Sequence, residues 1–314
     1  MVEEKIRETM HSINVLQKAV IRMFSELSKG NKTIFYEYTE KLDIIMANLE
    51  KEGQRQKQEY KGLKLDKAAN CCRYSLNRIV KYSYYNPSLA LNKIEFELVP
   101  FTDDMYEEYY FWTCIFPFRE KWDDYYRNEM PQLLKNPYLE NARKTGKYKY
   151  DLSIMVLAYN QLATTKLCVM NLINNIPRDF RCELILINNG STDETKEYFE
   201  SIMPTKQIDI QENFAFFRLV ERIIEGEFFL AVSNDIVVMP HAIENMLRTF
   251  EEDPKIVRVV PTTPNVSNHQ MIEGEFKTFD EMITWAKKNN VYDPYRHELR
   301  TRLVNPIEMV RSID

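Results

Sequence analysis

Residues 151–160 read Asp-Leu-Ser-Ile-Met-Val-Leu-Ala-Tyr-Asn, and residues 182–193 read Cys-Glu-Leu-Ile-Leu-Ile-Asn-Asn-Gly-Ser-Thr-Asp. Each stretch contains a short, continuous apolar run that ends in a polar cluster. Such a run is typical of a strand that is buried on both faces, as in a parallel sheet. The two stretches therefore predict two strands of a buried sheet, each followed by a polar loop.

Helical and extended patterns alternate through the rest of the second half of the chain. The further elements predicted there are helices at 164–175 and 214–225 and strands at 207–210 and 227–232. Another helix begins after the turn at 188–193, with Ser191 or Thr192 as its N-cap. This alternation predicts right-handed βαβ units on a mostly parallel sheet flanked by helices, which is an α/β fold.

Polar clusters follow three of the predicted strands, at residues 158–160, 188–190 and 233–235. In sheets of this class, ligands lie outside the carboxyl ends of the strands. We therefore expect the three clusters to converge on one ligand site.

The residue types at this site leave several roles open. Asp235 could hold Mg²⁺ or Mn²⁺ if the phosphates of a ligand completed the coordination shell, or it could cap the loop. Asn188, Asn189 and Gly190 could read a base or ribose, or form an ordinary strand-to-helix turn. Tyr159 could stack on a base or close the core.

Residues 1–150 are mainly helical in pattern and are expected to form a first domain, with residues 151–314 as the second. Apolar residues recur there at three- and four-residue spacing in two stripes. The stripes are Ile13, Leu16, Val20, Phe24 and Leu27, then Ile34, Tyr38, Leu42, Ile45 and Leu49. The two helices could form a hairpin or a short coiled coil through which the chain self-associates. No pattern in this half indicates its role.

Composition excludes several classes of protein. Apolar residues make up 44% of the 314 residues, and the net charge is −5, which disfavours a generic nucleic-acid binder. The Tyr-rich stretch at 73–85 could stack bases or sugars, but packing against a helix bundle is the favoured interpretation. The five cysteines lack CxxC spacing, and no apolar run approaches the length of a membrane span. We expect a cytoplasmic protein, with peripheral attachment to the inner face of a membrane as an alternative.

Three stretches taken together, at residues 153–160, 183–193 and 226–240, resemble family 2 glycosyltransferases. The resemblance covers about residues 151–312. It implies the GT-A fold and transfer of a sugar, with inversion, from a nucleotide-diphospho sugar to a glycan or other hydroxyl acceptor. It also implies Mg²⁺ or Mn²⁺ as cofactor and a place in bacterial polysaccharide biosynthesis.

The resemblance assigns roles to individual residues. Tyr159 is similar to the aromatic residue that lines the base pocket, and Asp235 to the metal ligand of the Asp-x-Asp-type motif. The donor-binding residues that it implies are Ala158, Tyr159, Asn160, Asn188, Asn189, Gly190 and Asn234.

The sequence also departs from the family pattern. Asn189 stands where the family often has an Asp that reads the base, and Asn234 removes one anionic ligand from the metal motif. The acceptor region and its carboxylate general base are expected beyond Asp314, so the catalytic base is unassigned. A non-catalytic nucleotide-sugar-binding scaffold or regulatory module is therefore the alternative function. An RNA-binding helical half is a third and weaker one.

Overall fold

The computed structural model describes residues 2–213, 219–263, 270–299 and 307–312. The chain divides into two compact units. Unit 1 comprises Met1–Pro137 and Ile208–Ile223, and unit 2 comprises Tyr138–Gln207 and Ile224–Asp314. The first division falls upstream of the boundary expected at residue 150, and one later segment returns to unit 1.

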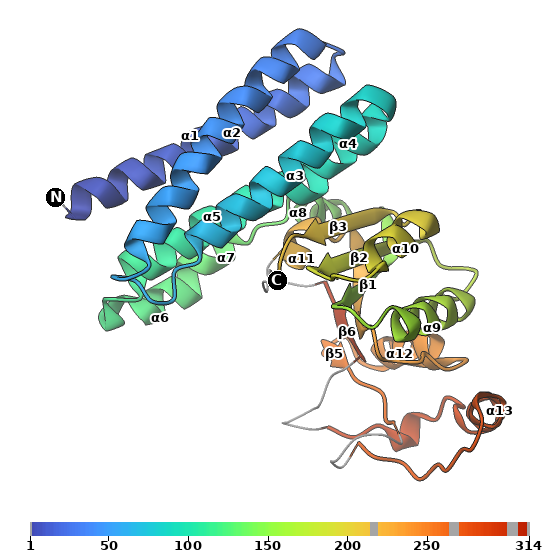
Figure 1. Ribbon diagram of the computed structural model, residues 1–314. Coiled ribbons are helices and arrows are strands. Elements are labelled where there is room, and N and C mark those ends of the chain that lie inside the picture. The colour runs from blue at the N-terminus through green and yellow to red at the C-terminus, as the bar shows by residue number, and fades with distance from the viewer. Residues whose placement is uncertain (1, 214–218, 264–269, 300–306, 313–314) are drawn as a thin grey trace. The chain divides into compact units, whose positions relative to one another are not determined.

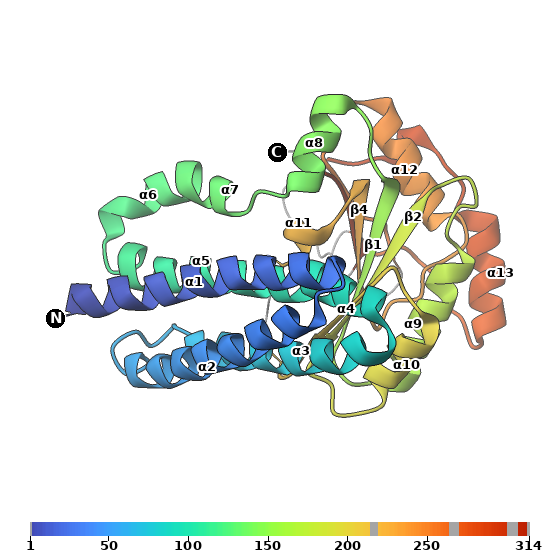
Figure 2. The same cartoon turned by 90° about the horizontal axis from the view of Figure 1, so that it is seen from above.

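Unit 1 consists mostly of helices. Its long helices are α1 (Val2–Ser28), α2 (Lys32–Gln56), α3 (Leu65–Tyr85) and α5 (Val99–Tyr110), which lie alongside one another in Figures 1 and 2. The shorter helices and helical turns are α4 (Pro87–Lys93), η1 (Ile94–Leu98), η2 (Phe111–Ile115), η3 (Arg119–Lys121), α6 (Trp122–Asp124), η4 (Tyr125–Glu129), α7 (Met130–Leu133) and α11 (Leu219–Ile223). The mainly helical character expected of this part is confirmed.

The first predicted apolar stripe is buried at four of its positions: Ile13, Leu16, Val20 and Leu27. In α2 the buried stripe is displaced by one residue at Thr39, which is buried in place of Tyr38, and at two further places. Phe35 is fully buried whereas Ile34 is 42% exposed, and Met46 is buried in place of Ile45. Both places hold two adjacent apolar residues, so spacing alone does not determine which one faces the neighbouring helices.

Buried ion pairs hold the returning segment, Ile208–Ile223, in unit 1. The Arg222 guanidinium donates to Asp104 at 2.8 Å and to Glu107 at 3.0 Å. At the other end of the segment, the Asp209 carboxylate accepts a hydrogen bond from Arg78. Because a buried charge requires a partner, these pairs tie the segment to the helices that supply them.

A six-stranded sheet has the order β3-β2-β1-β4-β6-β5. The strands are β1 (Tyr150–Ala158), β2 (Cys182–Asn189), β3 (Lys206–Ile210), β4 (Gly226–Ser233), β5 (Arg258–Val259) and β6 (Ile307–Arg311). Strand β1 pairs in parallel with β2 and β4, whereas β6 is antiparallel to β4 and β5. The mostly parallel sheet and the predicted strands are confirmed, with an antiparallel strand at one side.

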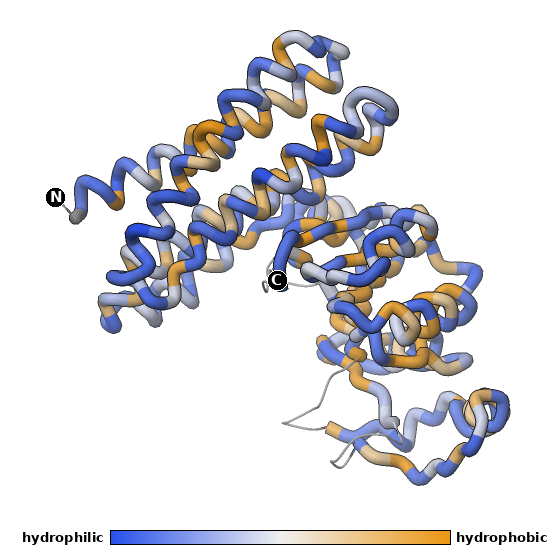
Figure 3. Tube along the Cα trace, viewed as in Figure 1, coloured by the Kyte–Doolittle hydropathy of each residue, from blue (hydrophilic) through white to orange (hydrophobic). Residues whose placement is uncertain are grey.

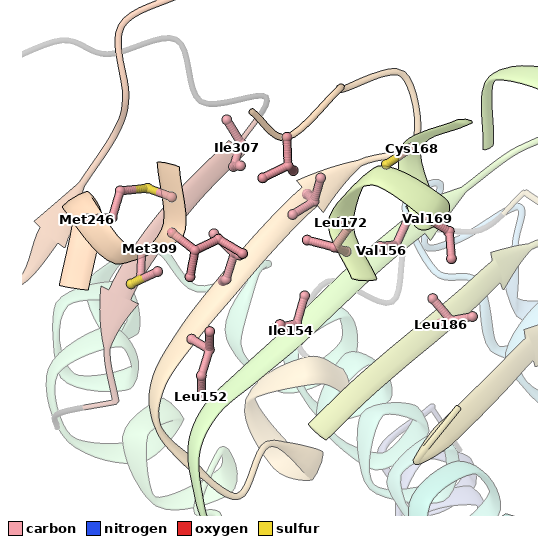
Figure 4. Packing of buried hydrophobic residues seen from close by; sticks show 14 of the residues in the cluster. Leu152, Ile154, Val156, Cys168, Val169, Leu172, Leu186, Met246, Ile307 and Met309 are labelled. Carbon is pink, nitrogen blue, oxygen red and sulfur yellow. The ribbon is translucent and has the colours of Figure 1, made fainter. Parts of the chain in front are cut away.

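Helices accompany the sheet in unit 2. They are α8 (Pro137–Thr145), α9 (Leu162–Asn174), α10 (Thr195–Ile202), α12 (Ala242–Glu252), α13 (Phe279–Asn289) and the turn η5 (Pro294–Arg296). Leu152, Ile154 and Val156 of β1 pack with Cys168 and Leu172 of α9, and all five are buried (Figure 4). The apolar segments of these elements stand out in orange in Figure 3. Of the helix predicted at 214–225, the described part is α11, and residues 214–218 lie outside the described residues.

A buried ionic cluster lies at the amino end of the sheet. The Lys206 ammonium donates to Glu183 at 2.5 Å and to Glu225 at 2.7 Å, and all three side chains are at most 3% exposed. The Glu183 carboxylate also accepts from the Ser153 hydroxyl and, at 2.7 Å, from the backbone N–H of Glu225. A ligand site is therefore expected at the opposite edge, where the strands have their carboxyl ends.

Candidate functional site at the carboxyl ends of the strands

The three predicted polar clusters meet at one edge of the sheet. The parallel register pairs Ala158 with Asn188 and Leu157 with Ser233, so β1, β2 and β4 end at the same level. Parallel strands bring their carboxyl ends to a common edge. The convergence expected from the sequence is therefore present in the strand register.

The loop after β1 has an unusual backbone. Asn160 and Gln161 both have positive φ angles, 56° and 59°. Non-glycine residues adopt this left-handed region uncommonly, and Asn does so most readily because its short side chain bonds locally. Tyr159, immediately before this turn, is 46% exposed. Its ring is therefore accessible, as stacking on a base requires.

Asn160 connects the β1 loop to the β2 loop. Its backbone N–H donates to the Ser191 hydroxyl at 2.9 Å. Its side-chain oxygen accepts from the backbone N–H of Thr192 at 2.8 Å and from the Thr192 hydroxyl at 3.3 Å. The side-chain oxygen that could face a ligand is thus already bonded within the protein.

The cluster at the end of β2 forms a tight turn. Asn188 accepts a hydrogen bond at its side-chain oxygen from the backbone N–H of Ser191 at 3.0 Å, and Gly190 has a φ of 77°. Asn188 and Asn189 are only 4% and 8% exposed. These residues therefore build the strand-to-helix turn, the structural role that the sequence left open beside ligand binding.

Asp193 joins two helices, a role that the sequence analysis missed. One carboxylate oxygen accepts from the backbone N–H of Leu162, the first residue of α9, at 3.0 Å. The other accepts from the backbone N–H and hydroxyl of Thr195, the first residue of α10, at 3.2 and 2.6 Å. The expected N-cap, Ser191 or Thr192, is therefore wrong, because the later carboxylate bonds the first turn. Burial alone would raise the pKa of Asp193, but the hydrogen bonds from Thr195 and Leu162 outweigh it and lower that pKa.

In the loop after β4, Asn234 is hydrogen-bonded within the protein whereas its neighbour Asp235 is exposed. The Asn234 amide donates to the carbonyl of Asn160 at 3.2 Å and to the Thr165 hydroxyl at 2.8 Å. Asp235 is exposed, and its carboxylate has no hydrogen bond or ion pair with any residue that the structure describes. The carboxylate predicted as metal ligand is thus the accessible one of the pair.

The donor set suits a divalent cation only in part. Nowhere in the described ranges do three or more His, Cys, Asp or Glu side chains come together as a metal site. The exposed oxygen pair of Asp235 is of the hard type that Mg²⁺ and Mn²⁺ prefer, but such ions need further oxygen ligands. A ligand with its own phosphate oxygens would supply them.

Two carboxylates in the α13 and η5 region are engaged in local caps. Glu281 accepts from the backbone N–H of Lys277 at 2.8 Å, next to the start of α13. Asp293 accepts from the backbone N–H of Tyr295 at 3.0 Å. Neither is assigned as a general base.

This arrangement defines a class of protein: an α/β domain with a mostly parallel sheet and polar loops gathered at the carboxyl edge, as in nucleotide-binding folds. Residues 153–301 match the family described as glycosyl transferase family 2, which confirms the resemblance seen in the sequence over that part of the chain. With the observed sheet, the match also confirms the expected GT-A fold class. No functionally curated protein sequence matches the chain.

Two solved structures illustrate the similarity. The first 349 residues of Staphylococcus aureus TarS in complex with UDP-GlcNAc align at 16% identity and a TM-score of 0.36, over 52% of this chain and 45% of that one. The mannosyltransferase PcManGT from Pyrobaculum calidifontis, in complex with GDP-Man and Mn²⁺, aligns at 18% identity and a TM-score of 0.30, over 44% of each chain. Each alignment thus spans less than half of the other protein. Among the described residues, no helix has both the length and the apolar character to cross a bilayer.

Proposed function

We propose that unit 2 binds a nucleotide-diphospho sugar at the carboxyl edge of its sheet and transfers the sugar, with inversion, to a glycan or other hydroxyl acceptor. One observation carries the proposal: the segment that matches the family brings three polar loops to one edge. There it exposes an aromatic ring, Tyr159, and an unpaired carboxylate, Asp235.

Each loop would contact a different part of the donor. The Tyr159 ring would stack on the base, and the turn of Asn188, Asn189 and Gly190 would form the wall beside it. Asp235 would hold Mg²⁺ or Mn²⁺, which when bound would supply positive charge to offset the charge on the departing nucleoside diphosphate. Ala158, Asn160 and Asn234 would complete the floor of the site.

A second function is favoured by a specific observation. Asn189 replaces a base-reading carboxylate and is buried, and the Asn234 amide is bonded to other protein groups. Both features reduce the number of groups that could contact a donor. A nucleotide-sugar-binding scaffold or regulatory module, without transfer activity, is therefore the alternative proposal.

The test is a thermal-shift titration of the chain with UDP, GDP, CDP and dTDP sugars, in Mn²⁺ and in EDTA. A ligand at about ten times its Kd stabilises the folded state by about 1.4 kcal/mol, a rise of a few degrees in Tm. We expect one nucleotide to raise the Tm only with Mn²⁺, and Asp235→Ala to remove that rise. Glu197→Ala, which removes another exposed carboxylate of unit 2, is the matched control and should respond like the wild type.

Two results would contradict the proposal. If no nucleotide raises the Tm, unit 2 does not hold a donor. If Asp235→Ala keeps the full Mn²⁺-dependent rise, the metal lies elsewhere. Release of nucleoside diphosphate on adding glycan acceptors then separates the enzyme from the scaffold, because only the enzyme consumes the donor.

A further inference from the structure

Among the described residues, side-chain hydrogen bonds join the loops after β1, β2 and β4 to one another, and Asp193 makes the first of these connections. Its two oxygens accept from the first backbone N–H of α9 and of α10, at 3.0 and 3.2 Å, and from the Thr195 hydroxyl at 2.6 Å. Hydrogen bonds to a charged acceptor are stronger than neutral ones. One carboxylate therefore bonds the first residues of both α9 and α10.

Asn160 makes the second connection, and its backbone requires one. Two consecutive residues with positive φ cost free energy that the surroundings must offset. The bonds that offset it are those from Thr192 to the side-chain oxygen of Asn160 and from the Asn160 N–H to Ser191. The left-handed turn is thus maintained by the β2 loop rather than by its own sequence.

Asn234 makes the third connection. Its amide bonds the carbonyl of Asn160 at 3.2 Å, which links the β4 loop to the same turn. The turn is therefore held from both sides, and it lies directly beside the two accessible groups of the site: Tyr159 precedes Asn160, and Asp235 follows Asn234.

We infer that Asp193, Asn160 and Asn234 are positioning residues of the donor site, which fix the three loops in one arrangement and thereby place Tyr159 and Asp235 for binding. The inference rests on the proposed function. It gives Asn160 and Asn234 a role different from direct contact with the donor, because their bonded side-chain atoms face other protein groups. It also adds Asp193, whose two carboxylate oxygens bond the first residues of α9 and α10.

The first test requires no ligand. Hydrogen exchange, measured by mass spectrometry on peptides spanning 159–166 and 189–196, reports the amides of Leu162 and Thr192. We expect Asp193→Asn and Asn160→Gly to accelerate exchange of these peptides about tenfold, because each removes a hydrogen bond that holds the loops. Glycine at position 160 relieves the positive φ, so the Asn160→Gly effect reports the lost connection rather than strain. Glu194→Gln, the neighbouring and exposed carboxylate, is the control and should exchange like the wild type.

The second test uses the nucleotide that passes the thermal-shift titration, with Mn²⁺, and measures Kd by calorimetry. We expect Asp193→Asn and Asn160→Gly to weaken binding about tenfold. Asn160→Asp keeps the acceptor oxygen for Thr192 and should recover most of the affinity lost in Asn160→Gly. If Asn160 instead touched the donor, the added charge beside the phosphates would make Asn160→Asp the weaker binder, and the positioning role would be overturned.

The outcomes separate this inference from the proposed function. If the wild type binds no nucleotide, the proposed function fails, and the exchange data alone decide whether the loops are held by these residues. If nucleotides bind but the variants exchange and bind like the wild type, the proposed function stands and the positioning role is wrong.

Discussion

Replacing Lys206 by methionine tests whether the buried ionic cluster holds the sheet together. The change keeps most of the apolar stem of the side chain and removes the ammonium group, which lies 2.5 Å from Glu183 and 2.7 Å from Glu225. Removing one partner of a buried pair usually costs about 3–5 kcal/mol, because the other charge remains buried without compensation. Here Glu225 keeps Lys149 at 3.0 Å, and Glu183 keeps the N–H of Glu225. We therefore expect Lys206→Met to lower the free energy of unfolding by about 3 kcal/mol, at the lower end of this range.

The assay is urea unfolding followed by circular dichroism, with a thermal scan in parallel. A loss of about 3 kcal/mol corresponds to a fall in Tm of roughly 6–12 °C for a unit of this size. Lys255→Met, on the exposed surface of unit 2, should change stability by less than about 0.5 kcal/mol. Adding Glu183→Gln to Lys206→Met removes one of the buried carboxylates that has lost its cation. The double variant should therefore recover part of the lost stability. A cost below about 1 kcal/mol for Lys206→Met would refute the reasoning, because the carboxylates would then not depend on this cation.

Two further stability predictions follow from single contacts. Gly226→Ala would place a Cβ atom 2.5 Å from the backbone nitrogen of Ser153, and both residues belong to paired strands. We therefore expect the free energy of unfolding, measured in urea, to fall by about 1–3 kcal/mol. An unchanged stability would contradict the close approach. Burial, only partly offset by Lys64, raises the pKa of Glu108 to about 7, so its ionisation opposes folding as the pH rises from the unfolded value of about 4.3. Glu108→Gln should therefore stabilise the protein above pH 7 and lose that advantage below about pH 4, and a stability difference independent of pH would contradict this assignment.

The strands of unit 2 could be predicted because a strand buried on both faces is apolar without interruption. The run from Ile154 in β1 shows this, since Ile154 and Val156 are fully buried on one face, and Met155 and Leu157, which alternate with them, are apolar too. The antiparallel placement of β6 beside β4 could not be read from pattern, because residues 307–311 pair with a strand more than seventy positions earlier in the chain. Burial requires an apolar sequence, but it does not specify the partner.

The candidate site was predictable in location but not in its internal bonds. The polar clusters marked the strand ends, and Asp235 and Tyr159 are exposed there, whereas the residue types alone left open whether Tyr159 closes the core and whether Asp235 caps the loop. The connections from Asp193 to Leu162 and from Asn160 to Thr192 join residues about thirty positions apart. No local spacing rule covers such bonds, so the sequence indicated a cap within one loop and missed the cap that Asp193 provides for two helices.

Asn234, where the family pattern has an Asp, stabilises the left-handed turn at Asn160. The amide of Asn234 donates to a carbonyl, and a carboxylate has no N–H with which to do so. An Asp at this position would instead face the carbonyl of Asn160 with a second acceptor and would leave the left-handed turn without its bond to the β4 loop. The residue that removes one anionic ligand from the metal motif therefore supplies a connection that the β1 loop needs. On the proposed function, Asp235 would be the carboxylate that holds a cation beside this turn, and the cation would bind there together with the phosphates of a donor rather than before them.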